Sequence, residues 1–209
     1  MKKIIIFLLG SMFFFSQASA AGLNIGISGS AGVFHATGTE VEATEEASED
    51  ASGKVGWASG FVELTMDRLA IGIEIVPGAL ESESTLNEQS DGGSVVTNTM
   101  QVDFENLYST YVMLNVTDNL YVRGGIMQVD VVTNENLATG SAYGDADLEG
   151  TIVAIGYDLK NDDGLFLRIE GNYMEFDDKT LTSTTNSDNT ASLKGLEGVS
   201  GKISVGKSF

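Results

Sequence analysis

The sequence predicts an all-β protein, an eight-stranded antiparallel up-and-down barrel, on three observations. Polar and apolar residues alternate with a period of two in eight segments of the chain. The connections between these segments are alternately short and long, as such a barrel requires when one end has tight turns and the other has loops. The last segment is itself a strand pattern that ends on an aromatic residue.

The eight predicted strands are, in chain order, 23–36, 55–66, 69–77, 98–116, 120–132, 147–158, 165–177 and 195–209. Each is as long as, or longer than, the about 9 to 11 residues that a tilted strand needs to cross a membrane. The short connections are 67–68, 117–119 and 159–164, and the long ones are 37–54, 78–97, 133–146 and 178–194. This order places both ends of the barrel domain at the short-turn end.

Composition limits the class of protein. The formal net charge of −19 argues against nucleic acid as a partner. The chain has no cysteine, so a disulfide framework is excluded. Pro77 is the only proline, while glycine occurs 25 times, which suits crowded strands and tight turns. The length fits one all-β domain, expected at residues 21–209.

The first 20 residues are expected to be a secretory signal peptide. Lys2 and Lys3 precede an apolar run at 4–15, and small residues follow up to Ala20, the expected cleavage point. The run is shorter than the roughly 20 apolar residues of a transmembrane helix. We therefore expect any insertion into a membrane to occur through strands.

The two faces of the strands differ in a way that favours a membrane barrel. One parity is small and polar, as in Gly26, Ser28 and Ser30, and the other is aliphatic, as in Ile25 and Ile27. An eight-stranded barrel has room inside only for side chains, so the small residues belong there and the aliphatic ones face lipid. The alternative, a soluble lipocalin-like periplasmic carrier, would turn the aliphatic face inward around a ligand.

Charged residues within the strands fall mostly on the small, polar parity and at similar heights. Counted from the nearest short turn or chain end, Glu63, Arg123 and Arg168 lie roughly four residues up, and the other three, Glu74, Glu170 and Lys202, roughly six or seven. We expect three acids to meet three bases inside the barrel as a structural network of ion pairs: Glu63, Glu74, Arg123, Arg168, Glu170 and Lys202. A gate or ion path is the other interpretation of this set. The second strand is ambiguous: if Glu63 points inward, so does Trp57, unless a bulge resets the strand.

The end of the chain carries a resemblance. In residues 201–209, Ile203, Val205 and Phe209 alternate with small or polar residues, and the chain stops on the aromatic ring. This resembles the C-terminal signature of Gram-negative outer-membrane β-barrels, which implies that Phe209 is an assembly signal for the barrel-assembly machinery. Lys207 departs from the pattern, although a lysine at the rim can extend its ammonium group to the lipid headgroups.

Residues 21–209 as a whole resemble the small eight-stranded outer-membrane barrels, the class of the OmpA transmembrane domain and OmpX. The resemblance implies an outer-membrane location, with extracellular loops and periplasmic termini. It also implies a plugged barrel with a structural or surface-interaction role and at most a weak porin-like conductance. The partners it implies are outer-membrane lipid and lipopolysaccharide; no cofactor is expected.

Two features leave other chemistry open. His35, the only histidine, lies near the outer end of the first strand and is where a lipid A-modifying or protease-type barrel enzyme would have its base. No nucleophile motif accompanies it, so a polar residue at the membrane rim is the simpler interpretation and no catalytic residue is predicted. Acidic residues crowd the loops 37–54 and 78–97, where they would share divalent cations or remain solvated.

Overall fold

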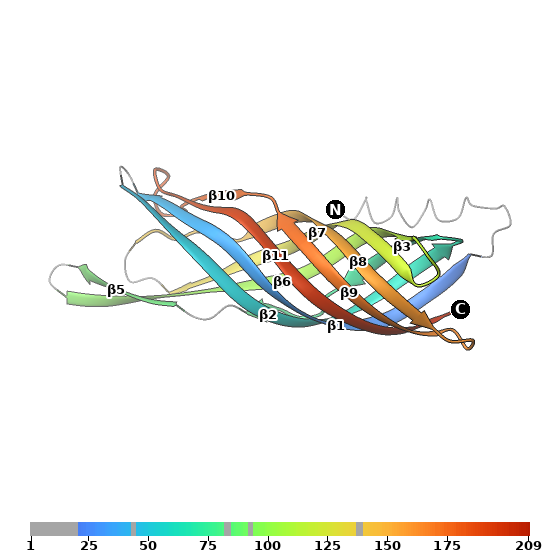
Figure 1. The fold of residues 1–209 in the computed structure, drawn as a ribbon. Coiled ribbons are helices and arrows are strands. Elements are labelled where there is room, and N and C mark those ends of the chain that lie inside the picture. Colours follow the sequence, from blue (N-terminus) through green and yellow to red (C-terminus); the bar gives the residue numbers. More distant parts are fainter. Residues whose placement is uncertain (1–20, 43–44, 82–84, 92–93, 137–139) are drawn as a thin grey trace.

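The computed structural model describes residues 21–42, 45–81, 85–91, 94–136 and 140–209. Eight strands of this part form a closed antiparallel ring, in which the last strand pairs with the first, so the predicted fold class is confirmed (Figure 1). In ring order they are β1 (Gly22–Glu42), β2 (Glu45–Met66), β3 (Leu69–Ile75), β6 (Ser94–Asn115), β7 (Leu120–Asn136), β8 (Ala146–Lys160), β9 (Leu165–Phe176) and β11 (Thr190–Ser208).

Tight turns close one end of the ring, at the positions where the sequence predicts them. Asp67 adopts a left-handed φ of 51° between β2 and β3, a conformation that aspartate tolerates better than most residues. Gly164 has a φ of 81° in the turn before β9. The first and last strands also meet at this end, where Asn24 pairs with Ser208.

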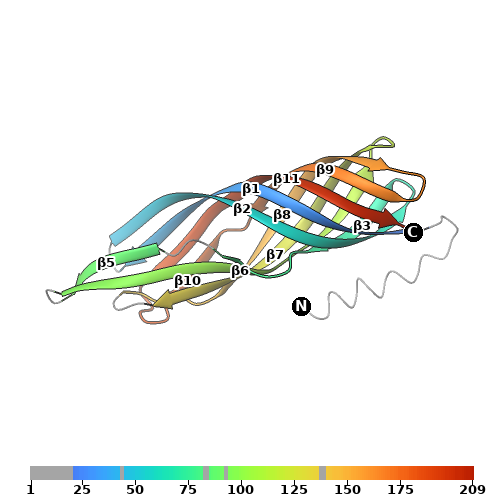
Figure 2. The same ribbon diagram turned by 90° about the horizontal axis from the view of Figure 1, so that it is seen from below.

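At the other end, part of what the sequence predicts as loops is sheet. β1 and β2 continue as a paired hairpin over 37–42 and 45–54, where hydroxyl groups bond across the strands, as Thr37 does to Asp50 at 2.7 Å. Three short strands extend the sheet further: β4 (Leu80–Glu81) and β5 (Thr85–Asp91) on β6, and β10 (Lys179–Thr182) on β11. Figure 2 shows these extensions projecting from the barrel.

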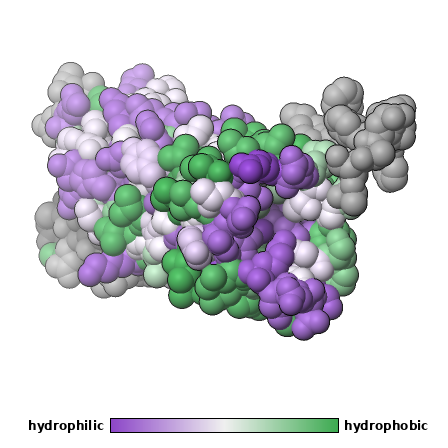
Figure 3. Space-filling view, turned by 45° about the vertical axis from the view of Figure 1, so that its right-hand side comes forward, coloured by the Kyte–Doolittle hydropathy of each residue, from purple (hydrophilic) through white to green (hydrophobic). Residues whose placement is uncertain are grey.

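Side chains alternate between the two surfaces of the ring. β9 shows this most clearly, because its residues are exposed and buried in turn along the whole strand. The exposed set is aliphatic: Ile27 keeps 66% of its surface exposed and Ile203 57%. In Figure 3 the apolar surface gathers toward the short-turn part of the molecule, and the strand extensions are mostly hydrophilic. This arrangement is the reverse of a lipocalin, whose aliphatic face encloses a ligand.

The ambiguity in the second strand is resolved in favour of an inward tryptophan. β2 pairs with β1 from Thr65 to Glu45 without a register shift, so no bulge separates Glu63 from Trp57. The Trp57 ring lies 6.2 Å from that of Phe34, centroid to centroid. The two aromatic side chains therefore fill the lumen above the level of the charged residues.

Inward glycines make room for inward aromatic rings. Six glycines lie directly opposite an aromatic residue on the neighbouring strand with its ring in the space that a Cβ atom would need: Gly26 with Phe61, Gly72 with Tyr111, Gly150 with Phe176, Gly156 with Tyr121, Gly198 with Phe34, and Gly206 with Phe166. The abundance of glycine thus reflects packing inside a narrow barrel as well as turns.

An apolar cluster fills the lumen toward the strand extensions. Its buried members are Met127, Val129, Leu148, Ile152, Met174 and Phe176. Within the residues that the structure describes, no helix is long and apolar enough to span a membrane.

Candidate functional site

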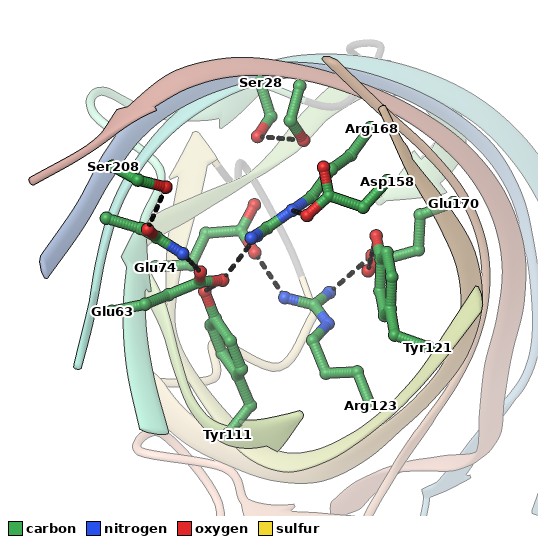
Figure 4. Close-up of polar contacts among 12 residues, drawn as sticks. Ser28, Glu63, Glu74, Tyr111, Tyr121, Arg123, Asp158, Arg168, Glu170 and Ser208 are labelled. Atoms are coloured by element: carbon green, nitrogen blue, oxygen red, sulfur yellow. Dashed lines mark hydrogen bonds and ion pairs between the residues drawn. The ribbon is translucent and has the colours of Figure 1, made fainter. Parts of the chain in front are cut away.

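The structure brings all six of the charged residues predicted for the lumen into one region. Glu63, Glu74, Arg123, Arg168, Glu170 and Lys202 are all buried, and they come from β2, β3, β7, β9 and β11. Figure 4 looks along the barrel and shows side chains of this set pointing from the wall toward the axis. They form two groups at different heights.

The upper group contains two acids and two bases. Arg123 contacts Glu74 at 2.7 Å and Glu170 at 2.9 Å. Lys202 contacts the same two carboxylates, at 3.0 Å and 2.8 Å. Asn172 also accepts a hydrogen bond from Arg123, at 3.1 Å. Each charge therefore has two partners of opposite sign, which is what a buried ion needs to offset its lost hydration.

The lower group is centred on Arg168, which contacts Glu63 at 2.7 Å and Asp158 at 3.0 Å. Glu63 also accepts hydrogen bonds from Asn24 at 2.9 Å and from Tyr111 at 2.8 Å. Asp158 was not among the residues predicted for the lumen. Its parity matches that of the inward residues of its strand, but it lies next to a turn, where a carboxylate is ordinarily solvated.

Aromatic rings pack against both charged groups. The Arg123 guanidinium lies 4.5 Å from the centroid of the Tyr111 ring, and that of Arg168 lies 4.4 Å from the Phe166 ring. Tyr121 donates a hydrogen bond to Glu170 at 3.0 Å. These contacts fix the side chains in place and leave no residue of the network as an obvious nucleophile.

The lumen above the ions is nearly filled. A cavity of about 40 Å³ remains between the upper group and the apolar cluster, large enough for a few water molecules. Ser30, one of the residues lining it, has a buried hydroxyl with no partner among the described residues. Trp57, Met127 and Ile152 also line this cavity. Among the described residues, the ion pairs, this small cavity and the apolar cluster therefore follow one another along the lumen.

A strap of residues 141–143 crosses the mouth of the barrel beyond the apolar cluster. The hydroxyl of Tyr143 donates to Glu40 on β1 at 2.8 Å, and its backbone N–H donates to Glu135 on β7 at 3.1 Å. These two strands lie opposite each other in the ring, so the strap crosses the opening. Burial and the hydrogen bond to Glu40 raise the pKa of Tyr143 to about 12. The phenol therefore stays a hydrogen-bond donor at neutral pH.

His35 lies outside the lumen. It is exposed on the outer surface of β1, where its Nδ1 lies 3.1 Å from the hydroxyl oxygen of Ser52 on β2. A shift in register between β1 and β11 follows it, between His35 and Thr37. The structure thus places the residue on the outer surface, hydrogen-bonded to Ser52 and directly opposite Glu197 of β11.

The other predicted features remain predictions. Residues 1–20, the expected signal peptide, lie outside the described part of the chain. Phe209 follows β11 and is 70% exposed. Among the described residues, no group of three or more histidine, aspartate or glutamate side chains is placed to hold a metal ion.

Comparison with known proteins gives likeness in structure alone. No family model and no curated protein matches the sequence. The outer membrane protein OprG of Pseudomonas aeruginosa matches with a TM-score of 0.59 and 12% identity, over 91% of this chain and 96% of that one. The fold is that of an outer-membrane β-barrel.

Two further structures match at lower scores. The outer membrane protease OmpT of Escherichia coli gives a TM-score of 0.48 with 10% identity, over 92% of this chain and 99% of that one. Ail, the attachment invasion locus protein of Yersinia pestis, gives 0.36 with 10% identity, over 88% of this chain and 99% of that one. At these identities the likeness concerns the fold, and function must be argued from the residues.

Proposed function

We propose that this chain is an integral outer-membrane barrel with a sealed lumen, and that its role is structural and surface-presenting. One observation carries the proposal: the exposed surface of the ring is aliphatic, while the inside is filled with paired ions, aromatic rings and small polar residues. Near the short turns, each strand of the ring is paired on both sides, so no strand edge is free there. A strand segment can lie in lipid only when its backbone groups are paired in this way.

The proposed orientation follows from the two ends of the ring. The short turns and the meeting point of β1 and β11 would lie in the periplasm, and the hydrophilic strand extensions would lie outside the cell. The finer resemblance to the OmpA transmembrane domain and OmpX belongs to this proposal. So do the barrel-assembly machinery, as the reader of Phe209, and lipopolysaccharide, as the neighbouring lipid.

The sealed lumen predicts electrical silence. The ion groups, the apolar cluster and the strap lie in series along the barrel, so ions have no wide water path through it. We expect the refolded protein in a planar bilayer to show no steady conductance above the baseline of the protein-free bilayer. A steady open level at neutral pH would contradict the sealed lumen and favour the gated interpretation of the ion pairs.

A second candidate function rests on the contact between His35 and Ser52. A histidine beside a serine at the outer-leaflet rim is the minimum for a hydrolase that acts on membrane lipids. In this case, mass spectra of lipid A would differ between cells with the wild-type protein and cells with the Ser52→Ala variant. We expect the two spectra to be the same, because His35 and Ser52 are both exposed and their hydrogen bond lies in contact with solvent; a difference would establish the enzyme.

A further inference from the structure

In the part of the chain that the structure describes, β2 has a long free edge. β1 covers this strand along its whole length, but β3 covers only Gly60–Met66. Beyond β3, the side of β6 that faces β2 around the ring is covered by β4 and β5. In the described part of the chain, β2 therefore has no neighbour on that side above Gly60. Figure 1 shows the β1–β2 and β5–β6 hairpins projecting separately.

The outer part of this edge, residues 46–53, has the properties of a template for another strand. All eight residues are exposed, so neither face of the hairpin is packed against the barrel. The side-chain hydrogen bonds that the described residues make here, such as Thr37 to Asp50, run within the hairpin toward β1. The backbone N–H and C=O groups on the free side are left for water or for an added chain.

The charges on this edge select the partner. Glu46 and Asp50 share one face of β2, about 13 Å apart at the rise of a strand, and Glu49 lies on the other face. The same edge of a second copy would set carboxylates against carboxylates, which is unfavourable for directly opposed residues. Lys54, at the base of the hairpin, is the nearest base on β2. The partner whose charges complement this acidic edge is therefore a basic peptide segment.

We propose that the free edge of β2 at residues 46–53 docks an extended, basic peptide segment of another molecule, which joins the sheet as an added strand. The inference rests on the proposed function, because the hairpin must stand outside the bilayer. If the added strand is antiparallel to β2, two successive partner residues lie opposite Asp50 and Glu49. The partner residue three positions further along lies opposite Glu46. The matching segment therefore has the pattern basic-basic-x-x-basic and contains no proline.

The experiment uses the full barrel refolded into lipid nanodiscs and a labelled peptide, Thr-Val-Lys-Lys-Thr-Val-Lys-Thr-Val. We expect saturable binding by fluorescence anisotropy. The triple variant Glu46→Gln, Glu49→Gln, Asp50→Asn removes three favourable cross-strand charge pairs, so the affinity falls about tenfold. A peptide of the same composition with its three lysines consecutive binds more weakly, since the spacing no longer fits.

Two controls separate strand addition from general attraction between charges. The variant Asp118→Asn, Asp162→Asn, Asp163→Asn removes three charges at the short-turn end and leaves the affinity unchanged. Hydrogen exchange of the backbone amides in 46–53 slows when the peptide binds, because the added strand pairs with them. Equal affinity for both peptides, or binding without slower exchange at 46–53, would overturn the proposal.

Failure of this inference differs from failure of the proposed function. A protein that inserts into nanodiscs but does not bind the peptide refutes the docking edge and leaves the barrel in the membrane. A protein that remains in solution without lipid or detergent refutes the membrane placement itself, and the docking edge with it.

Discussion

Replacing Arg168 by methionine is expected to destabilise the folded barrel by about 3–5 kcal/mol. The guanidinium is the base that contacts Glu63 and Asp158, whose side chains are 1% and 12% exposed. Without it, two carboxylates in the lumen lose their ion-pair partner while remaining away from bulk water. Equilibrium unfolding by urea in lipid vesicles, followed through the fluorescence of Trp57, measures the loss.

A second substitution shows that the loss comes from unpaired charge. Combining Arg168→Met with Glu63→Gln removes one of the stranded carboxylates, and we expect it to recover about 0.5–3 kcal/mol of the loss. Arg68→Met, in an exposed turn, is the matched control and should change the stability by at most about 0.5 kcal/mol. If Arg68→Met cost as much as Arg168→Met, the ion pairs in the lumen would not be what stabilises the fold.

Replacing Gly206 by valine is expected to destabilise the barrel by about 1–3 kcal/mol, the usual penalty for overpacking. A Cβ atom at this position would collide with the Phe166 ring and come within 2.5 Å of the backbone oxygen of Ile25. The second contact involves the backbone, so a side-chain movement cannot relieve it. The seam between β1 and β11, which closes the ring, would have to shift.

Gly201→Val is the matched control on the same strand. Gly201 faces outward, and a Cβ atom added to it would have no other atom within 4 Å among the described residues. Valine suits a strand surface that meets lipid, so we expect this variant to be as stable as the wild type or slightly more so. The measurement is gel electrophoresis of samples heated to a series of temperatures, which gives the temperature at which the compact band converts to the unfolded band. Equal transition temperatures for the two variants would contradict the packing described for the seam.

The strands and the filled interior could be predicted from the sequence because side chains in a barrel strand alternate with a strict period of two. Counting residues from the short turns placed Glu63 and Arg168 at one height, and the two side chains form an ion pair. The same count placed Arg123 at the height of Glu63 and Arg168. Its guanidinium instead contacts Glu74 and Glu170, which the count placed higher. Backbone height does not determine where a long side chain ends, so the partners of arginine were beyond this reasoning.

Other features depended on information that a strand pattern does not hold. The acidic composition of 37–54 argued for a solvated loop, but hydroxyl groups at Thr37 and Thr39 bond across to β2 and continue the hairpin. The strap over the mouth depends on contacts between residues 103 positions apart, such as Tyr143 with Glu40. The pairing of inward glycines with aromatic rings required the register between strands, which the sequence does not state.

The central claim is that the aliphatic face of the ring meets lipid and the polar face is enclosed. Since the chain has no cysteine, single cysteines can carry spin labels at Val199, Ser200, Ile203 and Ser204 of β11 in lipid vesicles. The account predicts that oxygen dissolved in the bilayer relaxes the labels at Val199 and Ile203 strongly, and those at Ser200 and Ser204 weakly. The reverse alternation, or relaxation of the labels at Val199 and Ile203 by a water-soluble nickel complex, would contradict it.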